Sequence, residues 1–141
     1  MTMNPLVGTW RLLSFEVRDE RGEITYPFGR DVLGFITYTA DGHMSVQFGR
    51  KDRPHLGADD WWGATPAEIS AAARDYFAYC GTYVYQDGEV VHRIGLSLMP
   101  NWIDGTQLRL VQLDRDTATL STHPMPVCGQ LQVATLVWQR V

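Results

Sequence analysis

Two Asp-Gly pairs, each between short segments of alternating, β-branched or aromatic residues, constrain this chain more than any other feature of its sequence. They are Asp41-Gly42, between residues 34–39 and 44–48, and Asp87-Gly88, between residues 82–86 and 90–98. Asp-Gly favours the tight turns with positive φ that join antiparallel strands. The sequence therefore predicts two β-hairpins in a chain built mainly from strands.

The rest of the chain continues this pattern of short strand-like segments separated by turn residues. Pro100 interrupts one run, because proline cannot donate to a β-ladder. The expected strands are residues 9–18, 34–39, 44–48, 82–86, 90–98, 107–113, 117–122 and 131–140. Eight consecutive strands with mostly short links and no β-α-β alternation predict an all-β fold, an eight-stranded antiparallel up-and-down barrel.

One helix is expected to interrupt the strands. Thr65-Pro66-Ala67-Glu68 matches a capping box with proline at the first helical position. Apolar residues then recur at helical spacing on one face, and Gly81 follows where a left-handed residue would end the helix. The residues of this face are Ile69, Ala73, Tyr76 and Cys80. The pattern predicts one inserted helix over about 66–80.

Composition and charge narrow the class of protein. With 141 residues, 45% of them hydrophobic, we expect a single domain over residues 1–141. A net charge of -4 without a basic block argues against nucleic acid as a partner, because phosphate binding needs clustered Lys and Arg. No apolar run approaches the ~20 residues of a membrane-spanning helix, so we expect no membrane association. Two cysteines without a disulfide pattern, and an N-terminus unlike a signal peptide, predict a cytoplasmic protein.

The segment 90–98 suggests a ligand. An eight-stranded barrel either fills its interior with side chains or holds one small molecule. One face of this segment places His92 among aliphatic residues such as Val90 and Ile94. If that face points inward, the imidazole needs a polar partner from protein, water or ligand. Five Trp, six Tyr and five Phe also suit a pocket of aromatic rings with few polar groups, so we expect a small hydrophobic or aromatic ligand.

We expect six side chains from the predicted strands and the Pro-Asn-Trp turn to line this site. They are Tyr38, Ser45, Gln47, Tyr83, His92 and Trp102. The spacing of the histidines and cysteines does not match a metal site, and glycine-rich phosphate loops are absent from the sequence. We therefore expect no metal and no cofactor, and a monomer or homodimer that binds a small molecule.

Two alternatives remain open. In the first, the barrel is a cofactor-free isomerase, cyclase or lyase acting on a secondary-metabolite-like substrate. His92 would then be the general acid or base, with Tyr38 or Tyr83 donating a hydrogen bond to a developing oxyanion. In the second, side chains fill the barrel, and the pair Trp61-Trp62 contacts a partner or a second copy of the chain.

Several strings along the chain resemble one known family. They are LVGTWRLLSFE at residues 6–16, GFITYTADGHMSVQ at 34–47, SLMPNW at 97–102 and LVW at 136–138. Together they resemble the bacterial and fungal lipocalin-like domain family of calycin-like β-barrels. The resemblance implies a lipocalin-like barrel that binds a small, often hydrophobic compound, with Trp10 of the Gly-x-Trp element closing one end. Some members of that family are cyclases or isomerases, but no catalytic motif carries over to residues of this chain.

Overall fold

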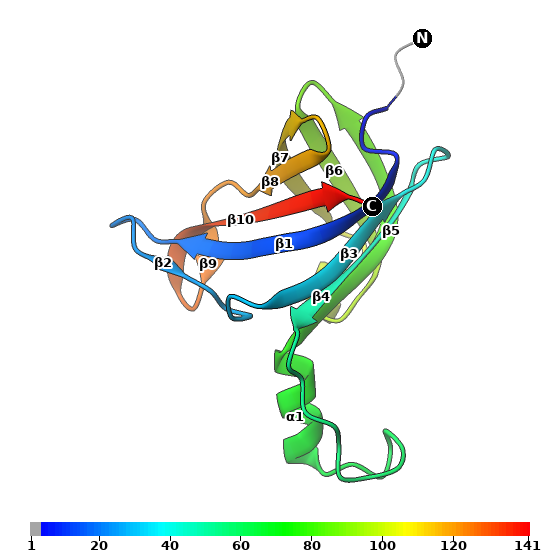
Figure 1. The fold of residues 1–141 in the computed structure, drawn as a ribbon, viewed down its shortest axis with the longest axis vertical. Coiled ribbons are helices and arrows are strands. Elements are labelled where there is room, and N and C mark those ends of the chain that lie inside the picture. The colour runs from blue at the N-terminus through cyan, green and yellow to red at the C-terminus, as the bar shows by residue number, and fades with distance from the viewer. Residues whose placement is uncertain (1–3) are drawn as a thin grey trace.

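The computed structural model describes residues 4–141 as one antiparallel β-sheet with an α-helix and a short 3-10 helix (Figure 1). The strands are β1 (Gly8–Arg18), β2 (Ile24–Thr25), β3 (Val32–Tyr38), β4 (His43–Arg50), β5 (Tyr76–Gln86), β6 (Glu89–Ser97), β7 (Thr106–Asp114), β8 (Thr117–Ser121), β9 (Met125–Val127) and β10 (Gln130–Arg140); the helices are α1 (Pro66–Arg74) and η1 (Pro100–Trp102). Their order in the sheet is β2-β1-β3-β4-β5-β6-β7-β8-β10-β9, and β1 also pairs with β10. All strands except the short β2 and β9 therefore close into the predicted eight-stranded barrel.

Both Asp-Gly hairpins are present. Asp87 and Gly88, between β5 and β6, have φ values of 55° and 77°, the left-handed pair that a two-residue hairpin turn needs. Gly42, between β3 and β4, has a φ of 95°. The turn chemistry of these residues thus sets two of the barrel's connections.

The inserted helix is shorter than the sequence predicted. Its N-terminus is the expected capping box: the Thr65 side chain accepts the Glu68 N–H, and the Glu68 carboxylate accepts the Thr65 N–H. The helix ends at Arg74, however, and the rest of the predicted span 66–80 belongs to β5, which begins at Tyr76. The prediction was therefore wrong for the last turn and a half.

Long-range pairing explains this difference. Phe77 and Tyr79, which alternate along β5 and face the interior, have backbones that pair with β4. Gly81 does not end a helix; it lies within β5, where a side chain would overlap the carbonyl oxygen of Arg93 in β6. Aromatic residues are as suitable for a strand as for a helix face, so the ladder with β4 overrides the local helical spacing.

A β-bulge at Gly95 reverses the facing of β6. Gly81 pairs with Ile94 and Cys80 with Leu96, so Gly95 is the extra residue between them. His92 and Ile94 before the bulge are each 1% exposed, whereas Leu96 after it is 65% exposed. The bulge thus keeps the histidine inside the barrel and turns the end of the strand outward.

One end of the barrel is closed by tightly packed side chains. The Nε1 of Trp10 donates to the carbonyl oxygen of Leu6 at 2.9 Å, and the guanidinium carbon of Arg140 lies 4.2 Å from the centre of the same indole. Trp138 and Tyr38 complete this end, and the described side chains there leave no room for a water molecule. Trp10 therefore has the closing role that the family resemblance implied.

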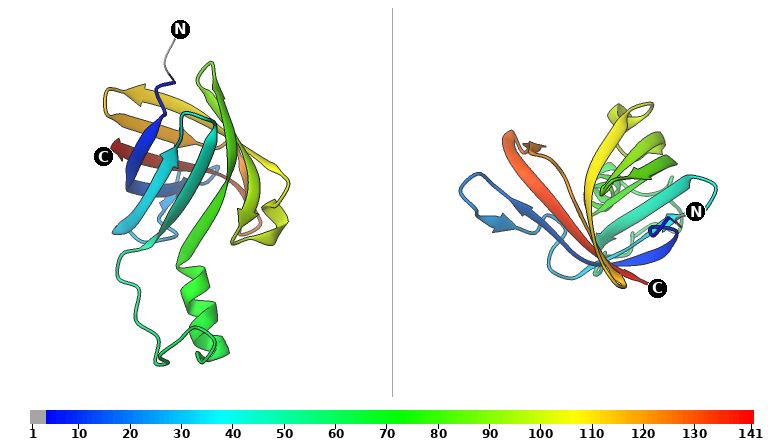
Figure 2. Two further views of the ribbon diagram at one scale, coloured as in Figure 1. Left: turned by 90° about the vertical axis from the view of Figure 1, so that its right-hand side faces the viewer. Right: turned by 90° about the horizontal axis from the view of Figure 1, so that it is seen from above.

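The segment between β4 and β5 stands away from the barrel (Figure 1; Figure 2, left). Helix α1 buries no residue, and an ion pair of 3.0 Å between Arg50 and Asp75 joins the two ends of this segment to each other where it leaves and re-enters the barrel. Trp61 and Trp62 lie on this segment, with exposures of 46% and 88%, and neither lines the barrel interior. No helix among residues 4–141 has the length and apolar character needed to cross a membrane.

Candidate functional site

Beyond the packed end, the barrel interior contains a partly open cavity of about 230 Å³. Every strand of the closed barrel contributes at least one side chain to its wall. A cavity of roughly 150 Å³ is enough to bind benzene, so this space fits a compound with one substituted aromatic ring. This part of the interior is therefore not filled by side chains, contrary to the filled-barrel alternative.

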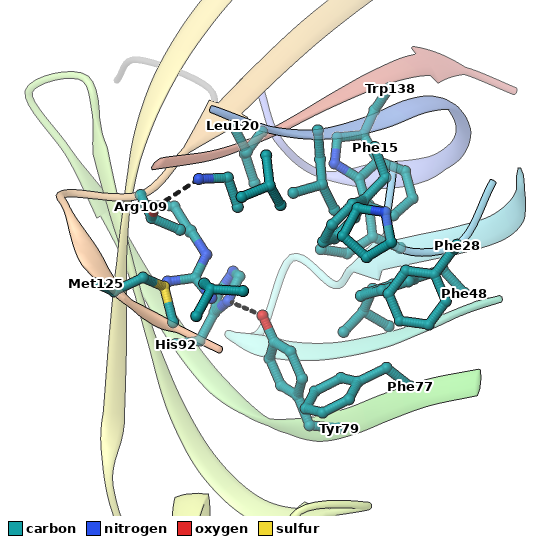
Figure 3. Close-up of a pocket in the computed structure, with 18 of the residues that line it drawn as sticks. Phe15, Phe28, Phe48, Phe77, Tyr79, His92, Arg109, Leu120, Met125 and Trp138 are labelled. Atoms are coloured by element: carbon teal, nitrogen blue, oxygen red, sulfur yellow. Dashed lines mark hydrogen bonds between the residues drawn. The ribbon is translucent and has the colours of Figure 1, made fainter. Parts of the chain in front are cut away.

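The cavity has an aromatic side and a polar side (Figure 3). The rings of Phe15, Phe28 and Phe48 form a mutually contacting cluster with centroid distances of 5.2–5.3 Å. Phe77 stacks on Phe48 at 5.9 Å and carries the cluster onto β5. On the opposite side lie the imidazole of His92 and the hydroxyl of Tyr79. An apolar surface that faces a few convergent polar groups is the usual composition of a small-molecule site.

His92 is held by two tyrosines. Its Nε2 lies 2.7 Å from the hydroxyl of Tyr38 on β3, and its Nδ1 lies 2.8 Å from the hydroxyl of Tyr79 on β5. All three side chains are buried, with exposures of 1% for His92, 1% for Tyr38 and 8% for Tyr79. The histidine is thus a fully satisfied polar group that joins three strands inside the barrel.

Burial keeps this histidine neutral. Loss of solvent, and secondarily the positive charge of Arg109, lowers the pKa of His92 to about 3. Burial also raises the pKa of Tyr38 and of Tyr79 above the usual value, so both phenols stay protonated. With both nitrogens occupied and a low pKa, the imidazole is suited to a fixed hydrogen-bonding role rather than to general-base catalysis at neutral pH.

Neutral imidazole has one N–H and one acceptor nitrogen, so one tyrosine donates to His92 and the other accepts. The accepting tyrosine keeps a free hydroxyl hydrogen. Tyr38 lies in the packed end, where that hydrogen would have no recorded acceptor among residues 4–141, whereas Tyr79 lines the cavity. A buried donor without an acceptor is costly, so the network assigns Tyr38 as donor to Nε2 and directs the free hydrogen of Tyr79 into the cavity.

Arg109 on β7 is the one formally charged residue among the described residues that line the cavity. It pairs in register with Val90, whose side chain is fully buried, and its own side chain accordingly turns inward. The guanidinium lies beside His92 and Met125 (Figure 3). The positive charge of Arg109 affects both His92 and Tyr79. It lowers the pKa of His92 and opposes the rise in the pKa of Tyr79.

The structure brings together only part of the set expected from the sequence. His92 and Trp102 line the cavity, and Tyr38 supports His92 from behind. Tyr83 packs edge-on against Tyr38 at 4.7 Å, but its hydroxyl donates to the carbonyl oxygen of Thr39, outside the cavity wall.

Ser45 and Gln47 do not line the cavity. They lie on the outer face of β4, where the Gln47 amide donates to the Ser45 hydroxyl, and the alternate residues Met44, Val46 and Phe48 face inward. The expectation placed the polar face of this strand inside the barrel, whereas this interior is mainly apolar. An aliphatic and aromatic face is buried in preference to a polar one because it gains more from leaving water.

Sequence reasoning missed Arg109, Tyr79 and most of the phenylalanines. Tyr79 was assigned to the helix, and this assignment concealed its inward position on β5. For Arg109 a signal existed, since it alternates with Val111 and Leu113 along β7, and these two residues belong to or pack against the core. A charged residue on the apolar face of a predicted strand is a candidate site residue.

Comparison with known proteins gives three findings. The family model described as "Lipocalin-like domain" matches residues 7–141. A curated relative, the 4'-hydroxy-3'-methoxypropiophenone carrier protein of Aspergillus oryzae, is 33% identical over 107 residues, which covers 70% of this chain and 96% of the relative. No solved structure matches the chain significantly.

Proposed function

The chain belongs to the lipocalin-like domain family, and on that basis we propose that it binds and carries a small, mainly apolar aromatic molecule in the cavity of its barrel. The observation that carries the proposal is the cavity of about 230 Å³, lined by phenylalanines on one side and by His92, Tyr79 and Arg109 on the other. A rigid barrel of this kind holds its cargo by shape and burial, and needs few polar contacts to orient it.

A compound with one aromatic ring and a carbonyl group fits this geometry. Its ring would pack against Phe15, Phe48 and Phe77, whose tilted and stacked contacts suit a further ring. Its carbonyl oxygen would accept the free hydroxyl hydrogen of Tyr79. The relative from Aspergillus oryzae is named for carrying an aryl ketone, 4'-hydroxy-3'-methoxypropiophenone, and we extend that chemical class to this chain as the proposed cargo.

Binding can be measured directly with that ketone as the probe. Trp102 and Trp138 both line the cavity, so their fluorescence is expected to change in a saturable, one-to-one titration. Ligand extracted after incubation should be chemically unchanged, as expected for a carrier. A new product that requires intact His92 would instead indicate catalysis and would contradict the carrier proposal.

A matched pair of variants locates the site. Val46 faces the cavity and is 2% exposed, whereas Val84 on the outer face is 64% exposed. Val46→Phe should fill part of the cavity and weaken binding at least about tenfold, while Val84→Phe adds the same atoms outside and should leave affinity unchanged. Circular dichroism checks that both variants fold. Equal affinity in the two folded variants, or a wild-type protein that does not bind the ketone, would overturn the proposal.

A further inference from the structure

Arg109 is a cation without an anionic partner in an apolar cavity. Its Nη1 donates to the carbonyl oxygen of Leu108 at 3.0 Å and to Oε1 of Gln107 at 3.3 Å, which are both neutral acceptors. Within residues 4–141, no carboxylate lies within ion-pair distance of its guanidinium, and the one further group that it approaches for hydrogen bonding among these residues is the neutral hydroxyl of Tyr79, where its charge and hydrogen bonding oppose the rise in pKa that burial causes. Arginine has five N–H donors, so at least two of them are available to a ligand.

This arrangement is costly for the protein alone. A charge among apolar side chains loses hydration and needs an opposite charge or hydrogen-bond acceptors to compensate. The chain as a whole is acidic, with a net charge of -4, yet none of its Asp or Glu side chains lines the cavity. A compensating negative charge is therefore absent from the described part of the protein, and the cavity has room for one on the ligand.

Tyr79 supplies a second donor on the same side. The Tyr38–His92 pair fixes the Tyr79 oxygen as an acceptor from Nδ1, so that its own hydrogen points into the cavity. A ligand oxygen that reaches both this hydroxyl and the guanidinium of Arg109 would receive charge-assisted hydrogen bonds, which are stronger than those between neutral groups. The phenylalanines across the cavity would hold the apolar part of the same molecule.

We propose that the cargo carries an anionic oxygen, a carboxylate or a phenolate, which Arg109 and Tyr79 bind together at the polar side of the cavity. The inference rests on the proposed carrier function and narrows it from aromatic compounds in general to aromatic acids and acidic phenols. Tyr38 and His92 are positioning residues that hold Tyr79 as a donor and do not touch the anion.

The test compares 4-ethylbenzoate with 4'-ethylacetophenone, in which a methyl group replaces one carboxylate oxygen, by isothermal titration calorimetry. Arg109→Met should weaken binding of the benzoate roughly ten- to hundredfold and binding of the ketone by no more than about threefold. Arg109→Lys should retain part of the benzoate affinity, because lysine keeps the charge without the planar array of donors. Arg11→Met, on the outer face of β1, is the matched control and should change neither affinity.

A second pair of probes distinguishes the two anion types. 4'-Hydroxypropiophenone, measured above the pKa of its phenol, is compared with its 4'-methoxy analogue; selective loss of the former in Arg109→Met identifies a phenolate site, and selective loss of the benzoate identifies a carboxylate site. Equal losses for charged and neutral probes, or wild-type binding of neutral probes alone, would overturn the inference and leave the carrier function intact. Failure of all four probes to bind would overturn both.

Discussion

The two ends of the barrel interior use the same strands for different purposes. At the closed end Trp10, Trp138 and Tyr38 pack without room for a water molecule, whereas toward the other end the same sheet surrounds about 230 Å³ of free space. Empty apolar volume lowers stability because side chains around it lose contacts. Dense packing is therefore concentrated at one end, where it stabilises the barrel. At the other end the cavity has room for a ligand.

Removal of the closing indole should give the largest loss of stability. Trp10→Ala deletes a side chain that is 1% exposed, together with its hydrogen bond to Leu6 and its contact with Arg140. We expect the free energy of unfolding to fall by about 3–5 kcal/mol, measured by urea denaturation followed by circular dichroism. If Trp10→Ala lost no more stability than truncation of a cavity phenylalanine, the packed end would not contribute more to stability than the cavity end.

The junction between the two ends should be nearly as sensitive. Tyr38→Phe leaves Nε2 of His92 without its partner in a buried place, so the free energy of unfolding should fall by about 1–3 kcal/mol. Tyr83→Phe is the matched control, because its hydroxyl bonds at a part-buried position away from the cavity wall. We expect the control to lose less stability in the same urea experiment and to keep ligand affinity. Equal losses of affinity in both variants would argue against a role for the Tyr38–His92 pair in orienting Tyr79.

Acid should destabilise the protein through His92. Its pKa is about 3 in the folded protein against 6.5 for an ordinary histidine, so between these values the unfolded chain binds the extra proton and stability falls as pH falls. The expected slope is up to about 1.4 kcal/mol per pH unit below the ordinary pKa. Urea denaturation between pH 7 and pH 5 measures it, and His92→Gln, which can still donate and accept, should flatten the profile.

Two carboxylates with a lowered pKa act at lower pH than His92. Hydrogen bonds lower the pKa of Asp41 from 3.8 and that of Glu68 from 4.5, so the stabilisation from these carboxylates is lost only as pH falls below those ordinary values. The interval from pH 7 to pH 5 therefore separates the contribution of His92 from that of these two carboxylates, and a flattened profile in the His92→Gln variant assigns the slope to this histidine. An unchanged slope in the His92→Gln variant would assign the acid sensitivity to some other group.

The cavity end should show the smallest change in stability and a clear change in binding. Phe28 is only partly buried, and its ring contacts Phe15 and Phe48 at the edge of the cavity. Phe28→Ala should cost about 1 kcal/mol in the free energy of unfolding, because the site already borders free space. Affinity for 4'-hydroxy-3'-methoxypropiophenone, measured by tryptophan fluorescence, should fall by roughly fivefold or more. Unchanged affinity would remove Phe28 from the binding surface.

The turns, the helix cap and the strands could be predicted from the sequence, because they depend on interactions between neighbouring residues. The two Asp-Gly turns, the Thr65–Glu68 capping box and the alternation on either side of the turns each depend on residues that are close in the chain. They were sufficient to predict the strand number and the barrel. Trp10 and His92 also stood out, because one lies in a recognisable element and the other is polar within an apolar alternation.

The site depended more on contacts between distant residues. The sequence could not show that Tyr79 belongs to a strand, because the helical spacing of Tyr76 and Cys80 around it is overridden only when β4 pairs with β5. Nor could it show that Gly95 is a bulge, or that the apolar face of β4 turns inward and leaves Ser45 and Gln47 outside. Each of these features depends on register, and a shift of one residue exchanges the two faces of a strand.

By itself, then, the sequence determined an all-β barrel with one helix, a closing tryptophan and a histidine in need of a partner, since turns, caps and alternation are encoded within a few residues. Only the tertiary structure decided that Tyr38 and Tyr79, 54 and 13 residues away in the sequence, bind that histidine, and that Arg109 lies beside it on the polar side of the cavity. The physical reason is closure of the barrel: β1 pairs with β10, and this ring of strands gathers side chains that no local pattern connects.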